Sequence, residues 1–125
     1  MIIGVGVDIV DTRRINSLLL KFQNRFIDKI FTQKESEYCL SKKDPSNYFA
    51  KMFSIKEATI KAISDSEGMS WHDMEISHND DGKPIMTLSG NALRNLRKKT
   101  QNFNIEISTS DERDYAIGFA IIESV

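Results

Sequence analysis

The chain has 125 residues, of which 40% are apolar and 28% are charged, and its formal net charge is −1 at pH 7. This size and composition predict a single globular domain spanning residues 1–125. The nearly balanced charge argues against a nucleic-acid-binding protein, because such modules are usually clearly basic. No apolar run approaches the roughly 20 residues that a membrane span needs. The apolar start lacks the basic segment and cleavage site of a signal peptide, so we expect a cytoplasmic protein with no membrane partner.

The first half of the sequence predicts one strand followed by four helical segments, each marked by its period or its cap. Ile and Val dominate residues 2–10 without regular polar alternation, which is typical of a buried strand. Thr32 and Glu35 are spaced as a capping box, and Asp44 precedes a proline at a first helical position. The expected elements are a strand at 2–10, a helix at 12–22 capped by Asp11, a short helical segment at 26–31, a helix from Thr32 to about Lys42, and a long helix from Pro45 to between Ser64 and Gly68.

The second half changes to the two-residue period of strands. A cluster of turn residues at 79–84 separates two short apolar runs and therefore predicts a hairpin. Ser89 offers a cap to one further helix, which ends in basic residues. The expected elements are strands at 72–77 and 85–88, a helix from Ser89 to about Lys99, and strands at 103–108 and 115–122 joined by a turn at 111–114. This order predicts an α+β fold with a mainly antiparallel sheet.

Two carboxylates stand where the surrounding pattern asks for apolar side chains. Asp8 interrupts the apolar strand, and Glu57 lies four residues after Phe53 and three before Ile60 on one helical stripe. A charge removed from water is costly unless it is paired or binds a metal, so the pair indicates a shared cation. Two carboxylates completed by water and phosphate oxygens are a typical Mg²⁺ site. The alternative is structural: Asp8 simply ends a strand, and Glu57 pairs with Lys61 or an arginine.

Basic residues supply a second group of candidates. Lys61, one turn after Glu57, is either a phosphate-binding or proton-transferring group beside the metal, or one half of a helical ion pair. Positive charges also recur along the first helix and the segment after it, at Arg13, Arg14, Lys21, Arg25 and Lys29. This run is either a solvated face or a docking surface for an acidic partner.

The remaining reactive side chains show no catalytic spacing. Cys39 is the one cysteine, which excludes an internal disulfide, and its helix implies no basic pocket, so we expect a buried, inert thiol. His72 and His78 have no metal-ligand spacing and are interpreted as surface or structural residues. No histidine accompanies Ser108 and Ser110, which disfavours serine-hydrolase chemistry.

Two segments together resemble a known family. Residues 4–10 read Gly-Val-Gly-Val-Asp-Ile-Val and are followed by Arg14-Ile15, and residues 53–62 match the pattern Phe-x-x-Lys-Glu-Ala-x-x-Lys-Ala. Both resemble signatures of the holo-acyl-carrier-protein synthases, the bacterial 4′-phosphopantetheinyl transferases, and the similarity extends over essentially the whole chain. The resemblance implies that family's α+β fold with a long central helix. It also implies transfer of 4′-phosphopantetheine from coenzyme A to a serine of apo acyl carrier protein, for fatty acid biosynthesis.

Residue by residue, the resemblance makes Asp8 and Glu57 the Mg²⁺ ligands, and it makes Asp8 and Lys61 contacts of coenzyme A. Glu57 and Lys61 become the catalytic residues, and the base that removes the serine proton is either Glu57 or a water on the metal. Arg14 and Arg25 would meet the acidic recognition helix of the acyl carrier protein. The family also implies a homotrimer with active sites at the subunit interfaces.

Three positions depart from the family pattern: Met52 replaces an arginine, residues 64–66 replace a Gly-x-Gly turn, and Asp111 replaces a histidine. All three replacements weaken contacts expected near the nucleotide of coenzyme A. Two other functions compete with the transferase: a non-catalytic module that binds an acidic helix, and a different Mg²⁺-dependent phosphate enzyme on the same scaffold. The non-catalytic module has no need for Asp8 and Glu57 together, whereas the transferase requires both.

Overall fold

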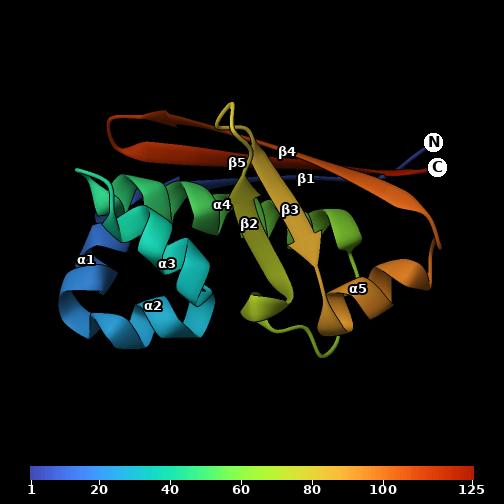
Figure 1. The fold of residues 1–125 in the computed structure, drawn as a ribbon, viewed down its shortest axis with the longest axis horizontal. Helices are drawn as coiled ribbons and strands as arrows, with labels where there is room; N and C mark the ends of the chain where they lie inside the picture. Colours follow the sequence, from blue (N-terminus) through green and yellow to red (C-terminus); the bar gives the residue numbers. More distant parts are fainter.

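The computed structural model describes all 125 residues, which form five β-strands, five α-helices and one short 3₁₀ helix (Figure 1). In chain order they are β1 (Ile2–Asp11), α1 (Thr12–Phe22), α2 (Asn24–Ile30), α3 (Gln33–Leu40), α4 (Pro45–Ile63), η1 (Trp71–Asp73), β2 (Met74–His78), β3 (Pro84–Leu88), α5 (Gly90–Arg97), β4 (Phe103–Glu112) and β5 (Tyr115–Ser124). None of the helices has the length and apolar character needed to span a membrane.

The long helix α4 and a three-stranded sheet form the two main layers. The strand order is β1-β5-β4, while β2 and β3 make a separate hairpin, and every strand pair is antiparallel. Figure 1 shows α1, α2 and α3 grouped at one end of the molecule and the two chain termini together at the other. This architecture confirms the predicted α+β fold with a mainly antiparallel sheet.

Small residues let α4 pack with its backbone directly against the sheet. Three glycines on the inward face of β1 and β5 meet three small residues spaced four apart on α4: Gly4 faces Ala62, Gly6 faces Ala58 and Gly118 faces Ser54. A Cβ atom added to any of these glycines would overlap the backbone of α4. Because alternate residues of a strand share one face, the same inward row continues to Asp8. The close packing therefore holds Asp8 beside the helix that carries Glu57.

The opposite face of the sheet is uncovered, so the prediction that residues 2–10 form a fully buried strand is wrong. Val5, Val7 and Ile9 are 54%, 54% and 61% exposed. Their cross-strand partners on β5 extend this apolar surface. We call it the open sheet face, and its six residues are Val5, Val7, Ile9, Ile117, Phe119 and Ile121. An apolar run predicts a strand buried on both faces, but it does not show whether the chain itself provides the second cover.

The most deeply buried charges form an ion pair that the sequence patterns did not predict. Lys56 of α4 and Glu35 of α3 both have side chains that are 0% exposed, and Lys56 Nζ lies 2.7 Å from Glu35 Oε1. The ammonium also donates to the carbonyl oxygens of Ile30 at 2.8 Å and Trp71 at 3.3 Å. Glu35 Oε2 accepts from the backbone N–H of Ile76 at 2.7 Å. The pair therefore ties α2, α3, η1 and β2 to the central helix.

Four of the five predicted helix starts are confirmed, whereas α2 begins at Asn24 rather than at Phe26. The predicted caps differ in their contacts. Asp11 accepts from the N–H of Arg13, and Thr32 forms the predicted capping box with Glu35. Asp44 and Ser89 occupy the capping positions of α4 and α5 but make no side-chain capping bond. The final strands are longer than predicted, because β4 continues to Glu112 and leaves only two residues for the turn.

Candidate active site

Asp8 lies near the middle of β1, on the face of the sheet that contacts α4. It pairs across the strands with Gly118, and its side chain is 19% exposed. Because β1 is an edge strand, the carboxylate sits at the margin between sheet and helix rather than in the core. Its position thus leaves the carboxylate within reach of solvent and of groups on α4.

Lys61 joins the helix to this margin of the sheet. Its Nζ donates to the backbone carbonyl of Val7 at 2.9 Å and to Asp8 Oδ1 at 3.3 Å. The first contact uses an edge-strand carbonyl, and the second brings the ammonium next to the predicted metal ligand. The Lys61 side chain is 53% exposed, so its contact with Asp8 is a surface ion pair. A phosphate could replace Asp8 as the partner of Lys61 at little cost.

Glu57 shares the electrostatic environment of Asp8 and Lys61. Burial raises the pKa of Glu57 above its ordinary value, and the negative charge of Asp8 raises it further. Lys61 and Arg14 act in the opposite direction. The structure therefore brings four of the predicted site residues close enough for their charges to interact: Asp8, Arg14, Glu57 and Lys61. Two neighbouring carboxylates that repel each other are the arrangement that a divalent cation stabilises.

The donor set is compatible with Mg²⁺ but not with a cation held wholly by protein. No group of three or more His, Cys, Asp or Glu side chains is arranged to bind a metal. Asp8 and Glu57 would thus supply two oxygen ligands, and water and substrate phosphates would supply the others. That sharing is normal for Mg²⁺, which gives up its water reluctantly and commonly binds through one or two carboxylates.

A groove with an apolar floor and a basic rim lies beside this carboxylate pair. Its volume is about 430 Å³, and nine residues line it: Arg14, Leu18, Phe22, Arg25, Phe26, Lys29, Ile30, Phe53 and Trp71. We call it the docking groove. Arg14 and Arg25, the two residues expected to meet a carrier protein, both line this groove, and no carboxylate does. Phe53, one helical turn before Glu57, connects the groove to the predicted catalytic residues.

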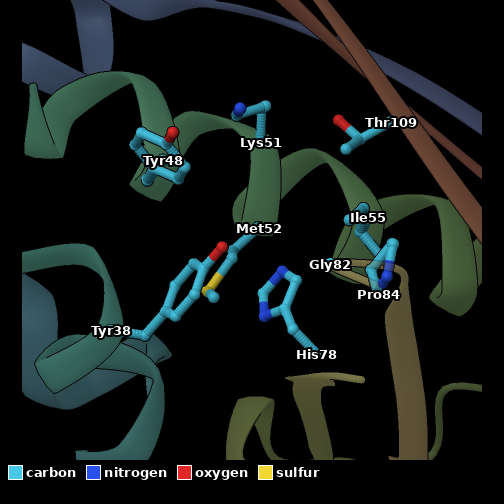
Figure 2. A pocket seen from close by; sticks show the side chains of 9 residues that line it. All are labelled: Tyr38, Tyr48, Lys51, Met52, Ile55, His78, Gly82, Pro84 and Thr109. Carbon is cyan, nitrogen blue, oxygen red and sulfur yellow. The ribbon is translucent and has the colours of Figure 1, made fainter. Parts of the chain in front are cut away.

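A second pocket, of about 250 Å³, lies between α3, α4, the β2–β3 hairpin and β4. Figure 2 shows Tyr38 and His78 side by side along one wall, with Tyr48 and Lys51 across from them. The Tyr38 and His78 rings are stacked with centroids 4.1 Å apart, and Lys51 Nζ lies 4.1 Å from the centroid of the Tyr48 ring. We call this the aromatic pocket. Sequence analysis missed it, because its residues come from five elements and form no local motif.

Two of the positions that depart from the resembled family pattern, Met52 and Asp111, make clear structural contacts. Met52 lines the aromatic pocket and is buried, with its sulfur 3.6 Å from Cys39 Sγ. Asp111 approaches the pocket's Lys51 at 3.7 Å and accepts from Asn47 at 3.0 Å. Ser64, which stands where the family has a glycine, has a φ of 73°. Cys39 is buried, as expected, and burial raises the pKa of its thiol to about 12, which disfavours the reactive thiolate.

Comparison with known proteins identifies clear relatives. Residues 4–120 match the model of the 4′-phosphopantetheinyl transferase superfamily. A holo-[acyl-carrier-protein] synthase from Aliivibrio fischeri is 38% identical over 125 residues, covering 98% of both chains. The crystal structure of the Neisseria meningitidis synthase has a TM-score of 0.87 and 35% identity, covering 99% of this chain and 100% of that one. The Bacillus anthracis synthase, solved in complex with CoA (3′,5′-ADP), has a TM-score of 0.82 and 27% identity, covering 100% and 99%.

Proposed function

The chain belongs to the 4′-phosphopantetheinyl transferase superfamily, and from this premise we propose that it is a holo-acyl-carrier-protein synthase. It transfers 4′-phosphopantetheine from coenzyme A to a serine of apo acyl carrier protein, with Mg²⁺ as cofactor. The products are holo acyl carrier protein, used for fatty acid biosynthesis in the cytoplasm, and adenosine 3′,5′-bisphosphate. The observation that carries the proposal is the grouping of Asp8, Glu57 and Lys61 at the edge of β1.

In this reaction the serine oxygen bonds to the phosphorus nearer the pantetheine, and the bond to the bridging oxygen of the pyrophosphate breaks. Adenosine 3′,5′-bisphosphate leaves with that oxygen. Phosphoryl-type transfer depends mainly on positioning and on neutralising the phosphate charge. Bound Mg²⁺ would supply most of that neutralisation, with Asp8 and Glu57 as its protein ligands. Lys61 adds a further positive charge, since its ammonium already lies against Asp8.

The proton of the attacking serine needs an acceptor, and Glu57 is the candidate among the side chains. Burial and the charge of Asp8 raise the pKa of Glu57 in the metal-free chain, whereas bound Mg²⁺ would lower it, so the base is either Glu57 or a water on the metal. The docking groove beside it would place the serine-bearing helix of a carrier protein within reach. Glu57 therefore lies where it can both orient and deprotonate the nucleophile.

The docking groove suits an acidic amphipathic helix such as that of an acyl carrier protein. Its floor offers apolar contacts from Leu18, Phe22 and Phe53, and its rim places Arg14, Arg25 and Lys29 around them. A helix with one apolar stripe flanked by carboxylates would match both features. The rim charges would guide the partner to the groove, while the floor would provide most of the buried area.

We infer that coenzyme A is shared between two copies of the chain. Tyr48, Met52 and Ile55 line the aromatic pocket, and Glu57 leaves the helix roughly 200° around from Ile55 because each residue turns by about 100°. The pocket and the carboxylate pair thus lie on different sides of α4. A homotrimer that covers the open sheet face would remove exposed apolar surface and bring one copy's pocket beside another copy's carboxylates. The basic and aromatic side chains of the pocket suit the adenosine bisphosphate part of the substrate.

The proposed function is tested by incubating the protein with coenzyme A, Mg²⁺ and apo acyl carrier protein and measuring the carrier's mass. We expect the carrier to gain one phosphopantetheine, and a carrier whose acceptor serine is replaced by alanine to gain nothing. Binding of the carrier without any change in its mass would instead indicate a non-catalytic module. Light scattering of the same sample tests the trimer, and a monomer at micromolar concentration would contradict it.

A further inference from the structure

His78 is a titratable side chain in the wall of the aromatic pocket that the transfer reaction does not use. It is half-buried at the end of β2, and its ring lies parallel to Tyr38, with an interplanar angle of 12° (Figure 2). The stack fixes the plane of the imidazole. The edge of the ring points into the pocket, toward Tyr48 and Lys51 (Figure 2). A ring held in this way is preorganised for a ligand, because little rotational freedom remains to be lost on binding.

The charges that face His78 from neighbouring elements are mostly positive. Lys42, after α3, lies 4.5 Å from the centroid of Tyr38, and Lys51 of α4 lines the pocket. The nearest carboxylate identified at the pocket is Asp111, which is paired with Lys51 at 3.7 Å. Lys83 in the hairpin turn is paired with Glu106 at 3.1 Å. No acid therefore faces the imidazole directly.

This environment disfavours protonation of His78 while the pocket is empty. Burial lowers the pKa of His78 below its ordinary value, and Lys42 and Lys51 lower it further. A phosphate between these lysines and the imidazole would reverse the balance, because its negative charge favours the protonated ring. Binding of an anion and binding of a proton would then favour each other, as linkage requires.

On the basis of the transferase function above, we propose that His78 is a proton-dependent contact for the nucleotide phosphates of coenzyme A. His78 takes up a proton as the nucleotide binds, so that affinity for the nucleotide rises as the pH falls from 8 to 6. The pocket lacks positive charge at Met52 and Asp111, where the resembled family has an arginine and a histidine. Lys42, just after α3, lies over the Tyr38 and Tyr48 rings of the pocket, and His78 of β2 would gain its charge more readily when a phosphate is present.

Isothermal titration calorimetry with adenosine 3′,5′-bisphosphate tests this role without requiring turnover. The wild-type protein is compared with His78→Gln, which keeps a polar side chain but cannot be protonated. His72→Gln is the matched control, because His72 is exposed and lies outside the aromatic pocket. Each protein is titrated at pH 6, 7 and 8, and at pH 6.5 in two buffers of different ionisation enthalpy to count the protons taken up.

For the wild type and His72→Gln, we expect roughly three- to tenfold tighter binding at pH 6 than His78→Gln shows, and near-equal binding of all three proteins at pH 8. A rise of about one in the pKa on binding corresponds to at most about tenfold in affinity. Proton uptake should be larger in the wild type than in His78→Gln. The phosphates titrate equally in all samples, so only the difference between variants reports on His78.

Coinciding pH profiles and equal proton uptake for His78→Gln and His72→Gln would overturn the inference. So would a failure of the bisphosphate to bind at every pH. Neither result depends on the transfer assay, which is scored separately by the mass of the carrier protein. If the protein transfers phosphopantetheine but the two variants have identical pH profiles of bisphosphate binding, only the proposed role of His78 is refuted. If the variants differ in the pH dependence of bisphosphate binding but the protein transfers nothing to the carrier, only the proposed reaction is refuted.

Discussion

Substituting Lys56 by methionine tests whether the buried ion pair holds the helical end of the molecule to α4. The ammonium makes three hydrogen bonds, to Glu35 Oε1 and to the carbonyl oxygens of Ile30 and Trp71, and both charged side chains are fully buried. Lys56→Met would leave the Glu35 carboxylate buried without its cation. Removing one partner of such a pair costs about 3–5 kcal/mol, far more than the pair contributes relative to an apolar replacement.

Urea denaturation followed by circular dichroism measures this loss. For an m-value of about 2 kcal/mol/M, a loss of about 4 kcal/mol lowers the midpoint by about 2 M. All proteins must be compared at one concentration, because self-association adds to stability by mass action. Lys61→Met is the matched control on the same helix, since its ion pair with Asp8 is exposed and should contribute no more than about 1 kcal/mol.

Glu35→Gln combined with Lys56→Met distinguishes the ion pair from simple packing. The glutamine removes the buried negative charge and keeps one oxygen, which can accept from the backbone N–H of Thr32 or of Ile76 but not of both, because these bind different oxygens of Glu35. The double variant should therefore be more stable than the sum of the two single losses predicts. Lys56→Met within 1 kcal/mol of the wild type, or strictly additive losses, would refute the reasoning.

Three further substitutions test the site itself. Arg14→Glu reverses a charge on the rim of the docking groove, so the KM for acyl carrier protein should rise while coenzyme A binding stays nearly unchanged. A loss of coenzyme A binding instead would place Arg14 at the nucleotide. Lys61→Met should lower kcat at least roughly tenfold, or about 1.4 kcal/mol of transition-state stabilisation, with little change in Tm. A variant that melts earlier yet turns over normally would make Lys61 a structural residue. Glu57→Gln removes a carboxylate whose pKa is raised by burial and by Asp8. A raised pKa stabilises the folded state fully only below the ordinary value of 4.5, and that contribution disappears as the pH rises through the folded-state pKa. With chelator present, the variant should therefore melt above the wild type at pH 7, and this gain should vanish at pH 4.5 and below; equal melting temperatures at pH 7 would count against the electrostatic argument.

Local patterns predicted the elements of the fold well, because caps and periods act within a few residues. The capping box at Thr32 and the proline start of α4 are confirmed. The same local view concealed a second role of Glu35, since the residue that completes the capping box also neutralises Lys56 21 positions later. The exposure of Val5, Val7 and Ile9 was equally hidden, because apolar composition does not show which face of a strand lacks a cover.

The candidate site was predictable where a charge interrupts an apolar pattern. Asp8 and Glu57 broke their strand and helix patterns, and the structure brings them into one electrostatic environment with Lys61. The aromatic pocket broke no pattern: His78 and Tyr38 are ordinary residues of a strand and a helix, and only the packing of the hairpin against α3 makes them neighbours. A pocket whose lining residues all fit the patterns of their own elements leaves no local signal in a single sequence.

The central claim is that Asp8 and Glu57 act together, holding one divalent cation for phosphopantetheine transfer. The most direct measurement is the rate of holo acyl carrier protein formation over a range of Mg²⁺ concentrations for the wild type, Asp8→Asn and Glu57→Gln, with circular dichroism confirming that each variant is folded. We expect the wild-type rate to saturate with Mg²⁺ and to fall to background with chelator, and both variants to remain near background at every concentration. A folded variant of either residue that turns over at the wild-type rate at limiting Mg²⁺ would contradict the claim.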